Sequence, residues 1–138
     1  MLTAIQAELA NLLAADAYFI GPPSIPVLVE DKGDLEFEID KAINEIGISV
    51  VIITPKAEVR IGNALLTIVA GITENVVVNR AETGTQKAAV DVAEKIWDLL
   101  NNTSLTSTKS RLIVDGLELV EARGLLVYEV RFKTEVFL

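Results

Sequence analysis

The chain has 138 residues, of which 51% are hydrophobic and 23% are charged, and its formal net charge is −8. This composition excludes intrinsic disorder, and the length suits one domain, over 1–138, with a sizeable core. The longest apolar runs, 46–53 and 64–72, are about half as long as a membrane-spanning helix requires. A net negative charge also argues against binding to nucleic acid by the isolated chain.

The first predicted element is a helix over 3–15. Its apolar residues recur at helical spacing, and Thr3 and Gln6 fit a capping box, in which two side chains satisfy backbone N–H groups of the first turn. The proline-rich stretch 21–26 ends regular structure. A short strand over 27–29 is expected next.

The segment 34–46 is ambiguous because its apolar residues alternate at first, as in a strand. We favour a helix, since the spacing of Leu35, Ile39, Ile43 and Ile46 continues to its end. Asp34 would then be the N-cap and Gly47 the residue that terminates the helix. A buried central strand is expected over 48–54, bounded by Gly47 and Pro55.

The β-rich run 64–79 predicts a second long strand, with Gly71 as a bulge or bend. A helix is predicted over 84–101, opened by a capping box of Thr83 and Gln86. Its buried face would consist of Ala89, Val92, Ala93, Ile96, Leu99 and Leu100.

A polar loop over 101–110 leads to a closing hairpin of strands 111–121 and 125–137, with Asp115-Gly116 as a second candidate turn. The element order is therefore α-β-α-β-β-α-β-β. This order predicts an α+β fold, in which helices pack on one face of a mostly antiparallel sheet.

The sequence contains neither His nor Cys. It therefore lacks the residues for a Ser-His-Asp or Cys-His nucleophilic site, an ordinary zinc site or thiol redox chemistry. Catalysis is therefore the less favoured interpretation of this sequence.

The acidic segment 30–40 supports one alternative. Glu30, Asp31 and Asp34 could supply oxygen ligands to calcium or magnesium, or acid–base groups, in a metal-dependent enzyme or binding module. Their spacing differs from that of a calcium-binding loop. A solvated loop, or an acidic rim on an assembly surface, would have the same sequence.

Polar residues also interrupt the β-rich run 64–79. Glu74 and Asn75 lie within it, and Asn79-Arg80 ends it just before the next helix. They fit either an interface or turn contact, or a solvent-facing strand side with a closing Asn.

A strand that carries a Glu and ends in Asn-Arg, followed by Gly-Thr and an amphipathic helix, runs through TENVVVNRAETGTQKAAVDVAEKIWDLLNN. Together with the closing hairpin IVDGLELVEARGLLVYEVRFKTEV, this stretch resembles the tail terminator and tail-completion proteins of long-tailed bacteriophages and prophages, which are also described as minor tail proteins. The upstream segment from IPVLVEDKGDLEFEID onward is similar to the start of that family.

The resemblance implies a structural virion protein that is not an enzyme and needs no cofactor. Such a protein forms a ring, commonly a hexamer, that caps the tail tube and docks to a head-completion or neck protein. It would be found in the virion tail, and in the host cytoplasm during assembly. Another neck or minor tail role is the alternative within the same class.

Eight residues are candidate interface residues, five from the motif match and three from the acidic segment. They are Glu74, Asn79, Arg80, Gly84 and Thr85 from the matched motif, and Glu30, Asp31 and Asp34 from the acidic segment. The β-rich C-terminal run would expose a strand edge unless another subunit covered it.

Overall fold

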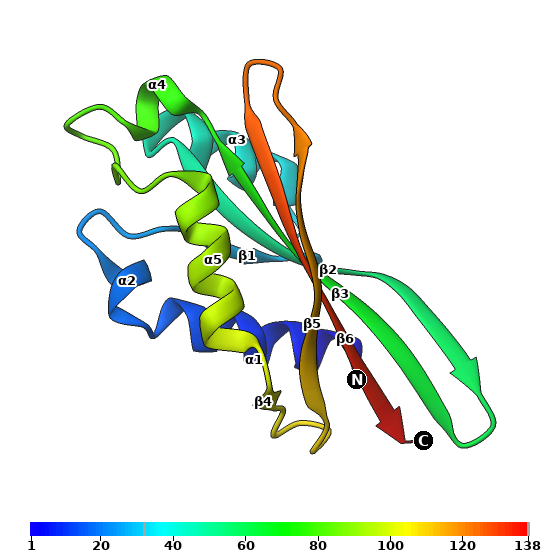
Figure 1. Cartoon of the computed structure of the whole chain (residues 1–138). Coiled ribbons are helices and arrows are strands. Elements are labelled where there is room, and N and C mark those ends of the chain that lie inside the picture. Colours follow the sequence, from blue (N-terminus) through cyan, green and yellow to red (C-terminus); the bar gives the residue numbers. More distant parts are fainter. Residues whose placement is uncertain (32, 138) are drawn as a thin grey trace.

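The computed structural model describes residues 1–31 and 33–137. Within these ranges the chain forms five helices and six strands (Figure 1). In chain order they are α1 (Leu2–Ala14), α2 (Ala17–Ile20), β1 (Val27–Val29), α3 (Leu35–Glu45), β2 (Ile48–Arg60), β3 (Asn63–Glu74), α4 (Val76–Asn79), α5 (Ala89–Leu100), β4 (Thr103–Ser104), β5 (Arg111–Glu121) and β6 (Leu126–Phe137). Among the described residues, none of the helices has the length and apolar character needed to cross a bilayer.

The strands form one sheet in the order β1-β2-β3-β6-β5-β4. β1 and β2 pair in parallel, and the other four neighbouring pairs are antiparallel. β3 lies at the centre, because it pairs along its whole length with β2 on one side and with β6 on the other. The predicted α+β class with a mostly antiparallel sheet is confirmed.

Helices α1 and α5 cover one face of this sheet (Figure 1). Side chains alternate between the two faces of a strand, so every second residue of the long strands points toward these helices. The buried strand residues of this core are Ile48, Val50, Ile52, Ala64, Leu66, Ile68, Ala70, Ile72, Leu112, Val130, Phe132 and Val136. Each large apolar side chain buried there contributes roughly 1.5–3 kcal/mol relative to an exposed position.

Helix α3 is the crossover between β1 and β2, as a parallel strand pair requires. Helix α3 lies on the face of the sheet to which Leu28 of β1 points. Leu28 and Ala42 of α3 line a hollow of about 240 Å³ there. The neighbours of Leu28, Val27 and Val29, pack against the main core instead. The prediction of helices on one face therefore describes α1 and α5, and α3 departs from it.

Both predicted capping boxes are wrong. α1 begins one residue earlier than expected, after Met1, and α5 begins at Ala89 rather than at Gly84, without a side-chain cap from its own N-cap residue. The segment 84–88 forms a loop. The start of α3 at Leu35 and its termination by Gly47, which has a φ of +96°, are as predicted, although Asp34 makes no capping hydrogen bond.

The strands differ from the prediction in three places. β2 continues through Pro55 to Arg60, and the register shift lies between Ile53 and Lys56. Gly71 is in regular register with both neighbouring strands, so the bulge predicted there is wrong. Residues 76–79 form the short helix α4 instead of strand.

The closing hairpin is confirmed as β5 and β6. Asp115-Gly116 does not form a second turn, because the register shifts between Val114 and Gly116 while β5 continues. The expected polar loop after α5 also contains the short strand β4.

Candidate functional site

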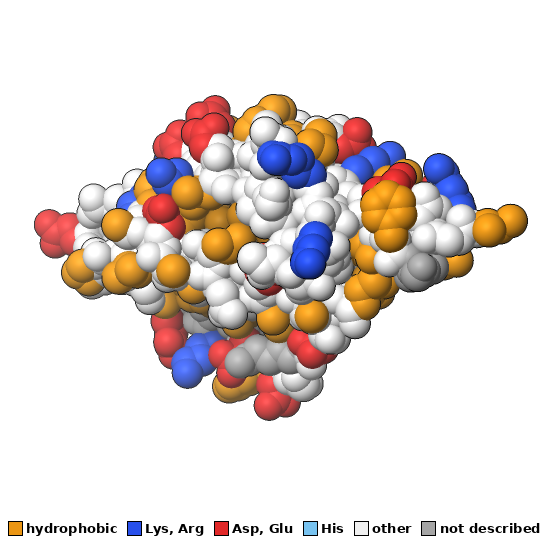
Figure 2. All heavy atoms as spheres, turned by 90° about the horizontal axis from the view of Figure 1, so that it is seen from below, with side chains coloured by type: hydrophobic (Ala, Val, Ile, Leu, Met, Phe, Trp, Pro, Cys, Tyr) orange, Lys and Arg blue, Asp and Glu red, His pale blue; other side chains and the backbone are white. Residues whose placement is uncertain are grey.

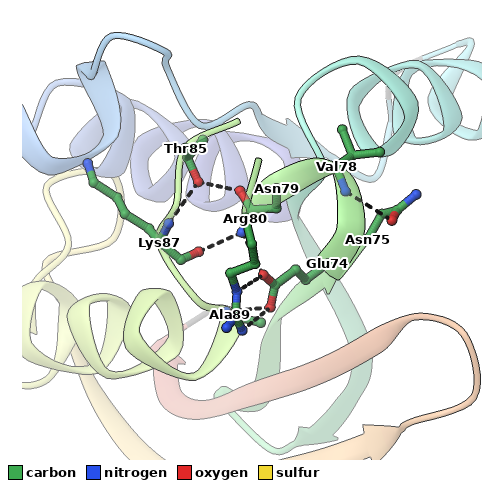
Figure 3. A network of polar contacts seen from close by, with 8 residues as sticks. All are labelled: Glu74, Asn75, Val78, Asn79, Arg80, Thr85, Lys87 and Ala89. Atoms are coloured by element: carbon green, nitrogen blue, oxygen red, sulfur yellow. Dashed lines mark hydrogen bonds and ion pairs between the residues drawn. The ribbon is translucent and has the colours of Figure 1, made fainter. Parts of the chain in front are cut away.

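Glu74 is the last residue of β3, and its side chain is completely buried. Its Oε2 accepts hydrogen bonds from Asn79 Nδ2 at 2.6 Å and from Arg80 Nε at 2.8 Å. Its Oε1 accepts from Arg80 Nη2 at 3.2 Å and from the backbone N–H of Ala89 at 2.9 Å. Each carboxylate oxygen therefore has two donors, and the residues converge as Figure 3 shows.

The bond to Ala89 explains where α5 begins. Ala89 is the first residue of that helix, and the N–H groups of a first turn have no partner within the helix. The positive end of the helix dipole also favours a nearby negative charge. Glu74 thus caps α5 from the end of β3, which is the role that the sequence assigned to Thr83 and Gln86.

Asn79 closes α4 and is completely buried. Besides its bond to Glu74, its Nδ2 donates to the carbonyl oxygen of Lys87 at 2.8 Å. Its Oδ1 accepts from the hydroxyl of Thr85, and its carbonyl oxygen accepts from the backbone N–H of Gln86 at 2.8 Å. Asn79 therefore shapes the loop between α4 and α5.

Asn75 explains why three β-branched valines form a helical turn rather than more strand. Its side chain is the N-cap of α4 and accepts from the backbone N–H of Val78. Its own N–H donates to the carbonyl oxygen of Gly47 at 2.7 Å. These local bonds offer the backbone an alternative to the sheet ladder.

Two glycines allow the backbone to approach Asn79 closely. A Cβ at Gly84 would lie 2.3 Å from the carbonyl oxygen of Asn79, and one at Gly47 would lie 2.2 Å from its nitrogen. No side chain fits at either distance. Gly47 also has a positive φ, which glycine adopts without steric strain.

The partners of Glu74 stabilise its negative charge in the protein interior. Burial disfavours the ionised carboxylate, but hydrogen bonds from Arg80, Asn79 and the Ala89 N–H outweigh this effect and lower its pKa below the usual value. The same ion pair raises the pKa of Arg80. Arg80 is 45% exposed whereas Glu74 is 0% exposed, so the pair joins the interior to the surface.

This geometry describes a structural clamp. A carboxylate offers about four lone-pair positions, and four donors occupy those of Glu74. A carboxylate engaged in this way has no position left to accept a proton from a substrate or to ligate a metal. The clamp, defined here as Glu74, Asn79, Arg80, Gly84 and Thr85, fixes α4 and α5 against the end of β3.

The structure thus brings the five motif residues of the predicted interface together. Their observed contacts are within the chain, and the interface role stays a prediction, with Arg80 as the member of the Glu74–Asn79–Arg80 triplet that reaches solvent. The sequence missed Lys87, whose Nζ donates to the carbonyl oxygen of Tyr18 at 2.5 Å and lies 4.2 Å from the centre of the Tyr18 ring. A contact to a backbone carbonyl so far away along the chain leaves no pattern in the sequence.

The acidic residues lie apart from the clamp. Glu30 accepts from the backbone N–H of Thr54 at 2.8 Å and from Gln6 Nε2 at 3.0 Å, so it fastens α1 to β2. Gln6 is buried, which its position on the apolar face of α1 could have indicated. Asp31 and Asp34 are exposed.

The metal hypothesis gains no support from this arrangement. In residues 1–31 and 33–137, no three acidic side chains come together as a metal site would require. Asp34, Glu36 and Asp40 line a shallow hollow of about 420 Å³ around Phe37.

Apolar side chains are exposed where the sheet extends beyond the helices. The β2–β3 hairpin projects as an arm (Figure 1), on which Val59 is 74% exposed and Ile61 is completely exposed. Phe137, which pairs with Asn63 at the same end, is 75% exposed. Such side chains at the end of an arm are typical of contacts with other chains.

Comparison with known proteins gives a likeness of fold. No protein-family model matches the sequence, and no curated protein matches it either. Among solved structures, the chain is similar to a chain of the virion of a native gene transfer agent (GTA) particle, with a TM-score of 0.61 and 18% sequence identity. The match covers 99% of this chain and 96% of that chain. At this identity, the likeness establishes a shared fold.

Proposed function

We propose that this protein is a structural component of a phage-like virion and acts there as a tail terminator. The observation that carries the proposal is the fold, shared over 99% of the chain with a chain of the virion of a gene transfer agent particle. The resemblance of the segment around Glu74 to tail terminators favours the finer role. In that role, copies of the chain form a ring, a hexamer, which caps the tail tube and joins the tail to a head-completion or neck protein.

The exposed apolar residues support an assembly role. Val59 and Ile61 at the arm and Phe137 at the end of β6 lie at one end of the sheet, and a subunit that stayed monomeric would gain nothing from exposing them. Contacts between different patches on identical subunits produce rings when the rotation closes. The clamp around Glu74 suits a rigid subunit and a non-enzymatic function.

The first test is the oligomeric state of the purified chain. Light scattering coupled to size exclusion, over a range of concentrations, should give a mass six times the 14.9 kDa of one chain. Negative-stain electron microscopy of the same fractions should show rings. A monomer at every concentration would contradict the self-assembling ring.

The second test separates the terminator from another neck or minor tail role. Deleting the gene from the particle that encodes it should produce tails of uncontrolled length, because nothing stops polymerisation of the tube. Tails of normal length that lack heads would instead favour a neck protein. Complementation with an Arg80→Ala variant then tests the predicted interface role of Arg80, provided that the purified variant retains its fold.

A further inference from the structure

Strands β5 and β6 separate at one end of the sheet. Their pairing ends at Ile113 and Lys133, after which β5 pairs with β4 through Leu112 and Arg111. β6 continues to Phe137 and pairs with β3 on its other side only. Over 134–137, therefore, β6 presents one edge that has no strand partner in the described part of the chain.

A hollow of about 570 Å³ lies beside this edge, between the separated strands. We call it the β6 groove. Its lining combines three basic residues, Lys109, Arg111 and Lys133, with the apolar residues Leu65, Ile113 and Phe137, and contains one acidic residue, Glu135. Figure 2 looks onto this end of the molecule and shows basic, acidic and apolar side chains exposed among one another.

The complementary feature is the outer edge of β5. β4 covers β5 at Arg111 and Leu112 only, so the segment 115–121, which we call the β5 edge, has no strand on its outer side among the described residues. Its acidic residues are Asp115, Glu118 and Glu121. Within the chain, Asp115 lies 3.7 Å from Lys133 Nζ and Glu118 lies 3.2 Å from Arg131 Nη2. The apolar Leu119 and Val120 on the same segment are each about half exposed.

We infer that the β6 groove of one copy receives the β5 edge of a second copy, which adds to β6 as a further strand. This inference rests on the proposed ring. Unpaired strand edges pair readily with other chains, and peptide segments bind by adding to such edges, with side chains supplying specificity. Acidic and apolar residues of the β5 edge match the basic and apolar lining of the groove.

The charges also determine which pairing is favoured. Two β5 edges would place like charges opposite each other, which is unfavourable between neighbouring strands. Without Lys133 and Asp115, which pair with each other within the chain, the groove keeps the basic residues Lys109 and Arg111 beside Glu135, and the edge keeps two acidic residues and no basic one. The contact therefore joins two different surfaces of the chain. Such a contact repeats from copy to copy and gives a ring when it closes.

Charge reversal tests the contact. The groove variant is Lys109→Glu, the edge variant is Glu121→Lys, and the matched control is Lys41→Glu on α3. Lys133 and Glu118 are left unchanged because they pair with Asp115 and Arg131 within the chain. Each of the first two alone should raise the concentration at which the chain assembles by at least about tenfold, while the control should behave as the wild type does. A 1:1 mixture of the groove and edge variants should restore assembly, because every contact in an alternating ring is then between opposite charges.

Hydrogen exchange on the wild type gives an independent measurement. On assembly, amides in 134–137 and in 115–121 should become protected together. If the wild type forms rings but these amides stay unprotected, or if the groove and edge variants assemble as the control does, the inference is overturned while the ring stands. If the wild type stays monomeric at all concentrations, both the proposed ring and the proposed contact are contradicted.

Discussion

Replacing Glu74 with Gln tests whether the clamp stabilises the fold. The side chains have nearly the same shape, so the change removes the charge and replaces one acceptor oxygen with an NH₂ group. The Gln oxygen accepts from at most two of the four donors that Glu74 now serves. The NH₂ group would face donors where an acceptor is needed.

The expected magnitude follows from the burial of each partner. Hydrogen bonds to a charged group contribute about 1.5–3 kcal/mol each, and breaking a buried ion pair costs about 3–5 kcal/mol. Arg80 is 45% exposed, so its guanidinium can be solvated once the ion pair is lost. Its contribution to the loss of stability is therefore reduced. The bonds from Asn79 and Ala89 are buried and carry most of the effect, and we expect a loss of about 2–4 kcal/mol.

Urea unfolding followed by circular dichroism, at pH 7, measures this loss. The matched control is Glu129→Gln, which makes the same change at a partly exposed carboxylate 3.4 Å from Arg131 and should alter stability by less than about 1 kcal/mol. The loss of stability in Arg80→Ala should lie between that of Glu74→Gln and that of the control. If Glu74→Gln unfolds at the same urea concentration as the wild type, Glu74 is not the stabilising centre described here.

The pH dependence of the clamp, the close approach at Gly84 and the exposed tip of the arm can each be measured. The pKa of Glu74 is lowered from its ordinary 4.5, so its carboxylate stabilises the fold fully above that value and stops doing so as the pH falls through the folded-state pKa. In urea titrations from pH 7 to pH 3, the free energy of unfolding should therefore fall more steeply for the wild type than for Glu74→Gln. Equal slopes for the two proteins would contradict this. In Gly84→Ala, the new Cβ would meet the carbonyl oxygen of Asn79, and thermal unfolding should show that the fold is less stable by about 1–3 kcal/mol. In the control Gly116→Ala, the nearest neighbour of the new Cβ lies at 3.9 Å, and the stability should not change. Ile61→Ser removes a completely exposed side chain and should leave stability within about 0.5 kcal/mol of the wild type while weakening assembly in light scattering; unchanged assembly would exclude the arm tip from the contact.

Local patterns in the sequence predicted those elements whose own residues decide their structure. The α3 segment is helical although it begins with alternating residues, because its apolar spacing continues to Ile46 and Gly47 terminates it. The final hairpin likewise forms where two β-rich runs are separated by a short polar turn. Apolar periodicity reports which side of an element faces the core, and these elements follow it.

Predictions failed where a distant residue decides the outcome. The start of α5 is set by Glu74, fifteen residues earlier in the chain, so the Thr83 and Gln86 pattern was misleading. The 76–79 segment has strong strand propensity, yet Asn75, Asn79 and their partners make it a helical turn. Local propensity is worth less than a set of buried hydrogen bonds.

The sequence by itself determined the fold class and the apolar face of α5. The five clamp residues were indicated only by the family resemblance, as interface residues, and that role stays a prediction. Only the tertiary structure decided that Glu74 and Asn79 face inward and that Glu30 is bonded to Thr54 and Gln6, away from the clamp. The physical reason is that burial and hydrogen-bond partners depend on which segments meet in space, whereas periodicity reports only the local direction of each side chain.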